Sequence, residues 1–200
     1  LRSIGVEPTF YPVPNELADP IPFAEDETHA SYDPEYAHRF FVAMSNAARV
    51  MTSFRARFLG KCSPVHFFWG SFDLAVTRFS GRKAPPHPGG VRGLPDWITR
   101  EAYSHEVSSA GSWPGNADVP PIFYSYAYPT PETFASRPVS PESASFNAEL
   151  GEFILPYDAV RESESPDEEL MAFLQSTYEA AAGSGQWDSA AFELTDPREA

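Results

Sequence analysis

One apolar stripe constrains the fold of this chain more than any other feature of its sequence. From residue 36 to residue 58, apolar side chains recur at spacings of four, four, three, four, three and four, which places them along one side of an α-helix. The stripe consists of Tyr36, Phe40, Met44, Ala47, Met51, Phe54 and Phe58. Asp33 suits the N-cap, Pro34 suits the first helical position and Gly60 suits the stop. The sequence therefore predicts a helix over residues 34–59 that packs its stripe into a core.

Strands are predicted after this helix. Residues 64–79 have strand composition, and apolar side chains on both alternating faces predict a central strand covered on both sides, with His66 in or near the core. Because this run is too long for one flat strand, Gly70 is expected to mark a bulge, bend or turn. Further extended segments are predicted over residues 103–110, 122–128 and 151–155.

A second helix is predicted near the end of the chain. Ser165 and Glu168 form a capping box, and apolar residues continue at helical spacing over residues 166–182. The order of one helix, several strands and one helix lacks the regular alternation of parallel α/β folds. The sequence therefore predicts an α+β fold, with a mainly antiparallel sheet packed by the long N-terminal-side helix and the C-terminal helix.

The predicted domain organisation is a single α+β domain over residues 1–182 and a polar tail over 183–200, in which only Trp187 and Phe192 can anchor. Residues 12–34 and 80–96 are rich in proline, so both are expected to be irregular. The first residues resemble the last turn of a helix closed by Gly5. We therefore expect the chain to be the C-terminal part of a longer protein and to pair with a missing N-terminal portion.

Composition limits the class of protein. Apolar residues make up 42% of the chain, which is enough to drive folding, and there is neither an uninterrupted membrane-spanning run nor a secretory signal. The single cysteine, Cys62, cannot form an internal disulfide, so a soluble protein of the cytoplasm is expected. The net charge of −14 argues against nucleic acid as a partner. No membrane partner is expected either.

The positive charge of the chain is concentrated in its middle. Residues 49–100 carry nine Lys and Arg against two Asp, a net charge of +7, while the remainder carries −21. One interpretation is internal complementarity with the acidic flanks. The other is a site for a small anionic ligand, because Arg side chains present forked donors and glycines let backbone N–H groups approach an oxyanion. The candidate ligand-binding residues are Arg78, Arg82, Lys83, His87 and Arg92.

No catalytic signature is present. The chain contains no Walker loop, dinucleotide fingerprint, H-E-x-x-H, paired C-x-x-C or G-x-S-x-G motif, so no cofactor is predicted. Candidate acid/base residues are His66, Asp73, His105 and Glu106. Asp73 lies inside an apolar run, so its carboxylate requires a cation, such as Arg78 or Arg82, or several donors. Mixed ligands at arbitrary spacing do not define a metal site.

Three tyrosines alternate on one predicted strand, at positions 124, 126 and 128. Rows of aromatic side chains bind sugars or bases in some proteins, but they more often fill a sheet core. The sequence favours the core interpretation.

Three segments, at residues 61–82, 103–109 and 150–153, together resemble a bacterial family of unknown function, the domain of unknown function 5996. The similarity covers most of residues 1–182. It implies a further N-terminal half that this chain lacks. Because the family has no assigned activity, the resemblance implies no catalytic residue.

Two functional hypotheses therefore remain open. The first is a pocket near residues 78–106 that binds or acts on a small anionic molecule, because this region combines positive charge, a long Gly/Pro loop and titratable residues. The second is a non-catalytic structural or protein-interaction domain whose polar residues form internal ion pairs. Whether the protein is an enzyme is left undecided by the sequence.

Overall fold

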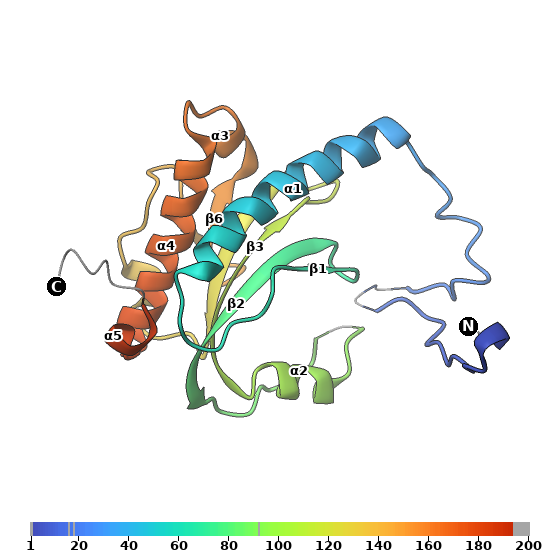
Figure 1. Ribbon diagram of the computed structural model, residues 1–200, viewed down its shortest axis with the longest axis horizontal. Coiled ribbons are helices and arrows are strands. Elements are labelled where there is room, and N and C mark those ends of the chain that lie inside the picture. Colours follow the sequence, from blue (N-terminus) through green and yellow to red (C-terminus); the bar gives the residue numbers. More distant parts are fainter. Residues whose placement is uncertain (1, 16, 18, 92, 194–200) are drawn as a thin grey trace.

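Six strands form one antiparallel sheet in the computed structural model, which describes residues 2–15, 17, 19–91 and 93–193 (Figure 1). The strand order is β1-β2-β3-β4-β6-β5. The strands are β1 (His66–Phe68), β2 (Asp73–Lys83), β3 (His105–Trp113), β4 (Ile122–Tyr128), β5 (Ser145–Asn147) and β6 (Glu152–Pro156). Every pairing is antiparallel, which confirms the predicted α+β class with an antiparallel sheet.

Helices accompany this sheet. They are α1 (Pro34–Ala56), α2 (Asp96–Ala102), α3 (Tyr157–Arg161), α4 (Pro166–Ser184) and α5 (Ser189–Phe192), with short 3-10 turns at Arg2–Ile4 and Phe134–Ser136. The long helices α1 and α4 pack beside each other across one face of the sheet (Figure 1). Helices α2, α3 and α5 and strand β5 are additions to the predicted elements.

Helix α1 begins as the sequence predicts. The Asp33 carboxylate accepts hydrogen bonds from the backbone N–H groups of Glu35, at 2.9 Å, and Tyr36, at 3.2 Å. The core part of the stripe is buried, and Met51 is 0% exposed. Tyr36, by contrast, is exposed, because the first turns of α1 extend past the sheet (Figure 1).

Helix α4 begins one residue after Ser165, at the predicted position. The predicted capping box is wrong, because the Ser165 side chain makes no capping hydrogen bond. The first turn is instead held by Asp167, which forms a two-pronged ion pair with Arg49 of α1, with N–O distances of 2.5 and 2.7 Å. The two helices are therefore fixed to each other by charge as well as by their apolar faces.

Residues 64–79 form a hairpin rather than one strand. A turn over residues 69–72 contains Gly70 and separates β1 from β2, as the glycine predicts. The predicted central position is wrong for β1, which is an edge strand, and His66 is exposed rather than buried in the core. The apolar character of β1 and of the turn that follows it comes from aromatic residues that stay exposed, such as Phe68 and Trp69.

The sheet has two different faces, set by the alternation of side chains along each strand. On the face beneath α1 and α4, Leu74 and Val76 of β2 join Phe123 of β4 and Phe153 and Leu155 of β6 in one apolar core. The opposite face carries the alternate residues, including Asp73, Tyr124 and Tyr126, and we call it the open face. The apolar core lies on the face beneath the helices, so a one-residue slip of any strand would move its core residues to the other face, and the register is strongly specified.

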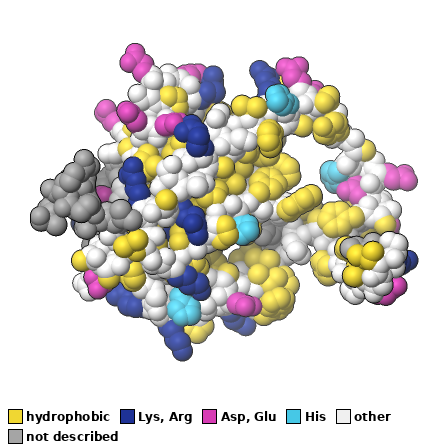
Figure 2. Space-filling model, in the orientation of Figure 1, with side chains coloured by type: hydrophobic (Ala, Val, Ile, Leu, Met, Phe, Trp, Pro, Cys, Tyr) yellow, Lys and Arg dark blue, Asp and Glu magenta, His cyan; other side chains and the backbone are white. Residues whose placement is uncertain are grey.

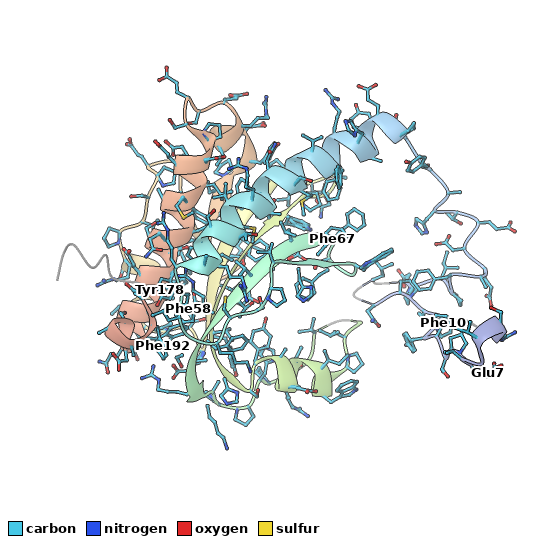
Figure 3. All side chains as sticks on the ribbon, in the orientation of Figure 1. Glu7, Phe10, Phe58, Phe67, Tyr178 and Phe192 are labelled. Atoms are coloured by element: carbon cyan, nitrogen blue, oxygen red, sulfur yellow. The ribbon has the colours of Figure 1, made fainter. Side chains whose placement is uncertain are left out.

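The two ends of the described chain differ in their contacts with the rest of the protein. Near the C-terminus, Phe192 packs on Phe58 with ring centroids 5.5 Å apart (Figure 3). Trp187 packs on Tyr178 with ring centroids 6.0 Å apart. Phe192 and Trp187 are the two residues that the sequence marks as anchors. The N-terminal segment, with Glu7 and Phe10, instead stands apart from the body and exposes hydrophobic side chains (Figures 2 and 3). The expected upstream portion of the protein stays a prediction.

Candidate functional site

Arg78, the first of the predicted anion-binding residues, lies in the core. Its side chain is 1% exposed, and its guanidinium carbon lies 3.5 Å from the ring centroid of Phe54 and 4.3 Å from that of Tyr178. The guanidinium also donates a hydrogen bond to the backbone carbonyl of Phe54, at the negatively polarised end of α1. Burial lowers the pKa of Arg78 to about 10, so the side chain keeps its charge at neutral pH.

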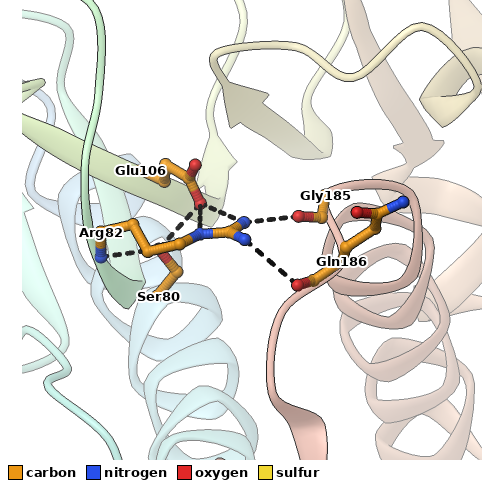
Figure 4. Close-up of polar contacts among 5 residues, drawn as sticks. All are labelled: Ser80, Arg82, Glu106, Gly185 and Gln186. Atoms are coloured by element: carbon orange, nitrogen blue, oxygen red, sulfur yellow. Dashed lines mark hydrogen bonds and ion pairs between the residues drawn. The ribbon is translucent and has the colours of Figure 1, made fainter.

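Arg82 joins the sheet to the end of α4 (Figure 4). Its Nε and Nη2 atoms donate to Glu106 Oε2, at 2.9 and 2.6 Å, and its guanidinium also donates to the backbone carbonyls of Gly185 and Gln186. The Ser80 hydroxyl donates to the same Glu106 oxygen at 2.8 Å. On the helix side of the sheet, the hydrogen-bonding groups of Arg82 and Glu106 are therefore engaged by protein atoms.

The other predicted site residues do not gather at one point. His105 lies at the start of β3, where its Nδ1 atom is 3.1 Å from the Ser104 hydroxyl, and Lys83 is paired with it in register across the sheet. His66 lies on the edge strand. His87 reaches the open face, whereas Arg92 lies outside the described residues. Asp73 is the candidate that the structure places at the centre of a cavity-lined surface.

Three adjoining cavities form a groove across the open face, which we call the open-face groove. The first, of about 400 Å³, and the second, of about 330 Å³, share Ser71, Asp73, Tyr124 and Tyr126. The third, of about 320 Å³, shares Tyr126, Leu150 and Glu152 with the second. The groove therefore runs from the β1–β2 hairpin, past the end of α2, to the start of β6.

Asp73 forms the polar centre of the groove. Its side chain belongs to a residue that is 7% exposed, and its carboxylate accepts hydrogen bonds from the Ser71 hydroxyl, at 2.5 Å, and from the Tyr124 hydroxyl. The donors that this buried carboxylate requires are thus hydroxyl groups, not arginines. Burial, followed by the charge of Asp73, raises the pKa of Tyr124, so its hydroxyl stays protonated and able to donate.

Gly111 makes the contact between Tyr124 and Asp73 possible. Tyr124 of β4 is in register with Gly111 of β3, which is in register with Ala75 of β2. A Cβ atom at Gly111 would overlap the Tyr124 ring, so the missing side chain lets that ring lie across β3 and reach β2. A glycine inside β3 therefore lets a side chain of the adjacent strand β4 reach across to β2.

Further hydroxyl and aromatic groups extend the groove. The hydroxyls of Tyr103 and Tyr126 lie 2.9 Å apart, as do those of Thr77 and Ser109. The His87 ring stacks on Tyr103 with centroids 4.9 Å apart. Burial raises the pKa of Tyr126 well above its usual value, so this phenol is neutral as well. The groove wall consequently presents ring faces and hydroxyl groups side by side.

Glu152 is the second carboxylate of the groove. It opens β6 and borders the second and third cavities. Burial, and then the negative charge of Asp73, raises the pKa of Glu152 to about 7. At neutral pH both the protonated and the ionised form of this side chain are consequently populated, and a positive charge nearby would favour the ionised form.

Sequence reasoning finds part of this site. It marks Asp73 and His87, and it notes the alternating tyrosines but favours a core role for them. It does not mark Glu152 or Gly111. The signal for Gly111 is present in the sequence, since a glycine inside a strand pattern often marks a place where another group packs closely against the backbone. Glu152 carries no comparable signal, because its raised pKa depends on burial in the fold and then on Asp73, a residue of a distant strand.

In the described part of the chain, no three or more His, Cys, Asp or Glu side chains are arranged to hold a metal ion. None of the helices over the same residues combines the length and the apolar composition needed to cross a bilayer.

The structure thus defines an α+β protein whose helices cover one face of an antiparallel sheet and whose tyrosines and carboxylates line a groove on the other. The chain belongs to the family of unknown function DUF5996, whose family model matches residues 1–194. This match confirms the resemblance carried by residues 61–82. No curated protein and no solved structure matches the chain.

Proposed function

We propose that the protein binds a small polar molecule in the open-face groove. The observation that carries this proposal is the position of Asp73, a buried carboxylate that borders two of the three cavities and accepts hydrogen bonds from the hydroxyls of Ser71 and Tyr124. Concave sites that combine aromatic walls with a few oriented polar groups are typical of small-molecule binding. Groups with shifted pKa values, such as Glu152, also occur often at functional sites.

The geometry favours this groove over an anion site built from the central arginines. Arg78 and Arg82 are engaged by protein atoms on the helix side of the sheet. In the described residues that line the three cavities, the charged side chains are carboxylates and no Lys or Arg is present. A negatively charged ligand would therefore meet repulsion in the groove rather than attraction.

A bulky substitution at the groove wall tests the proposal. Ala102 lines the groove at the end of α2 and is exposed, whereas its neighbour Glu101 is exposed but does not line any of the three cavities. Ligand-observed NMR should show binding of at least one of glucose, glycerol, choline and ethanolamine, whereas acetate, an anion, should not bind. We expect Ala102→Trp to weaken that binding at least tenfold and the matched control Glu101→Trp to leave it within twofold. Absence of binding, or equal binding to both variants, would contradict the proposal.

A second candidate function is protein interaction. The hairpin between β1 and β2 exposes Phe68, Trp69 and Phe72, and exposed groups of aromatic residues mark interaction surfaces. This candidate predicts that Trp69→Ser lowers concentration-dependent association, measured by analytical ultracentrifugation, while binding in the groove is unchanged. A monomer that does not associate at any accessible concentration would argue against it.

A further inference from the structure

We infer that the ligand of the open-face groove carries a positively charged amine or quaternary ammonium group. This inference rests on the proposed function and names its ligand class. The groove brings together two carboxylates, from Asp73 of β2 and Glu152 of β6, around a cavity of about 330 Å³ with Tyr124 and Tyr126 between them. Neither carboxylate forms an ion pair with a Lys, Arg or His side chain within the described residues.

The absence of a countercharge in this part of the structure has an energetic consequence. Burial, and after it the repulsion from the nearby charge of Asp73, raises the pKa of Glu152. Elsewhere in the described chain, Glu106 and Asp167 each have an arginine partner. A cation placed between Asp73 and Glu152 would relieve the repulsion, whereas a neutral ligand would leave it in place.

The aromatic walls favour the same class of ligand. The rings of Tyr124 and Tyr126 stack nearly parallel, with centroids 6.2 Å apart and an interplanar angle of 16°, and Tyr103 extends the wall beyond Tyr126. Ring faces attract cations because of their negative quadrupole, and this attraction strengthens where water is excluded. A sugar could also stack on these rings and donate hydroxyl hydrogen bonds to the carboxylates, but it would not neutralise their charge. Carboxylates and ring faces together therefore select an ammonium group.

The preference of the groove for a cation over a neutral ligand can be measured with two matched probes on the unmodified protein. Choline and 3,3-dimethyl-1-butanol have nearly the same shape and differ in the charge at one end, so their relative affinities isolate the contribution of charge. In isothermal titration calorimetry at pH 7.5 we expect choline to bind at least tenfold more tightly than the neutral alcohol. The advantage should shrink as salt increases, because counter-ions screen the attraction.

Charge removal in the groove supplies the second arm of the test. Glu152→Gln keeps the shape of the side chain and should reduce choline affinity about tenfold, while the neutral alcohol binds as before. The matched control is Glu149→Gln, an exposed carboxylate three residues earlier that does not line the three cavities. It should change choline affinity less than twofold. At pH 6.5, titrations in two buffers of different ionisation enthalpy should show proton release on choline binding, because the cation favours ionised Glu152.

The outcomes separate this inference from the proposed function. Equal affinity for the two probes, or an unchanged choline affinity in Glu152→Gln, would overturn the inference of an ammonium ligand. Binding of glycerol or glucose that Ala102→Trp removes, without binding of choline, would do the same and would leave the groove a binding site. If neither Ala102→Trp nor Glu152→Gln weakens the binding of any probe, both the inference and the proposed function fail.

Discussion

Gly111 is the residue on which the geometry of the groove most directly depends. An added Cβ atom would meet the Tyr124 ring and the backbone carbonyl of Leu74, so Gly111→Ala forces either the ring or the strand to move. We expect a loss of stability of about 1–3 kcal/mol, the usual cost of overpacking. Thermal unfolding would measure it.

A double-mutant cycle assigns this cost to the tyrosine. In a Tyr124→Ala background the ring is gone, so Gly111→Ala should cost clearly less than in the native chain, with only the carbonyl contact remaining. An equal cost in both backgrounds would mean that the ring does not lie over Gly111.

Glu152 should make stability depend on pH. Its pKa is about 7 in the folded chain against 4.5 for an unperturbed glutamate, so the folded state binds the proton more tightly than the unfolded state does. Stability from this group is therefore present in full below about pH 4.5 and is lost as pH rises to about 7. Glu152→Gln removes the titration. The variant should melt about 2–4 °C above the native chain at pH 8, the shift that about 1 kcal/mol produces after discounting for partial exposure.

The pH series contains its own control. Below pH 4.5 the glutamate is neutral in both states, so the native chain and Glu152→Gln should melt at nearly the same temperature. A difference that stays constant from pH 4 to pH 8 would mean that ionisation of Glu152 does not carry the effect.

At the residue scale, the sequence shows that a buried charged side chain requires a hydrogen-bond or ion-pair partner more readily than it shows which residue is that partner. It shows that Asp73 must find either a cation, such as Arg78 or Arg82, or several donors, and Arg78 is five residues away on the same strand. An odd separation places the two side chains on opposite faces, so Arg78 enters the core while Asp73 faces the groove. The actual donor, Tyr124, comes from a strand that no local pattern relates to β2.

At the scale of elements, helix α1 and its stripe should dominate stability. Met51 is fully buried, so Met51→Asp places an unpaired carboxylate in the core and should cost several kcal/mol, which is close to the whole stability of many domains. The matched control is Thr52→Asp on the exposed side of the same helix. Chemical denaturation should show a large loss for the first variant and little change for the second. An unchanged melting temperature for Met51→Asp would refute the packing of the stripe.

Elements with a strong periodic pattern are predicted well, and those defined by their neighbours are not. The two long helices and β4 begin at the expected residues, because caps, prolines and alternation act locally. Helix α2 is missed because its seven residues are too few for a clear period. The edge position of β1 is missed because aromatic residues that stay exposed resemble, in sequence, those of a central strand.

For the whole molecule, the charge distribution follows the interpretation of internal complementarity. Within the described residues, two arginines of the basic middle pair with carboxylates outside it: Arg49 with Asp167 and Arg82 with Glu106. These pairs join α1 to α4 and β2 to β3. Composition predicts that such pairing must occur but not which residues meet, since the partners come from distant parts of the chain. The fold class was predictable for the opposite reason, because it depends on the order of elements alone.

The alternation of side chains along the strands also bears on how this protein can change. On β2, Leu74 and Val76 hold the fold together, while Asp73, Ala75 and Thr77, one position away, face the groove. On β4, Phe123 and Tyr124 divide in the same manner. Mutational tolerance should therefore have a period of two along each strand. Natural variation, or a protein engineer, could re-line the groove for another ligand while the core beneath it stays intact.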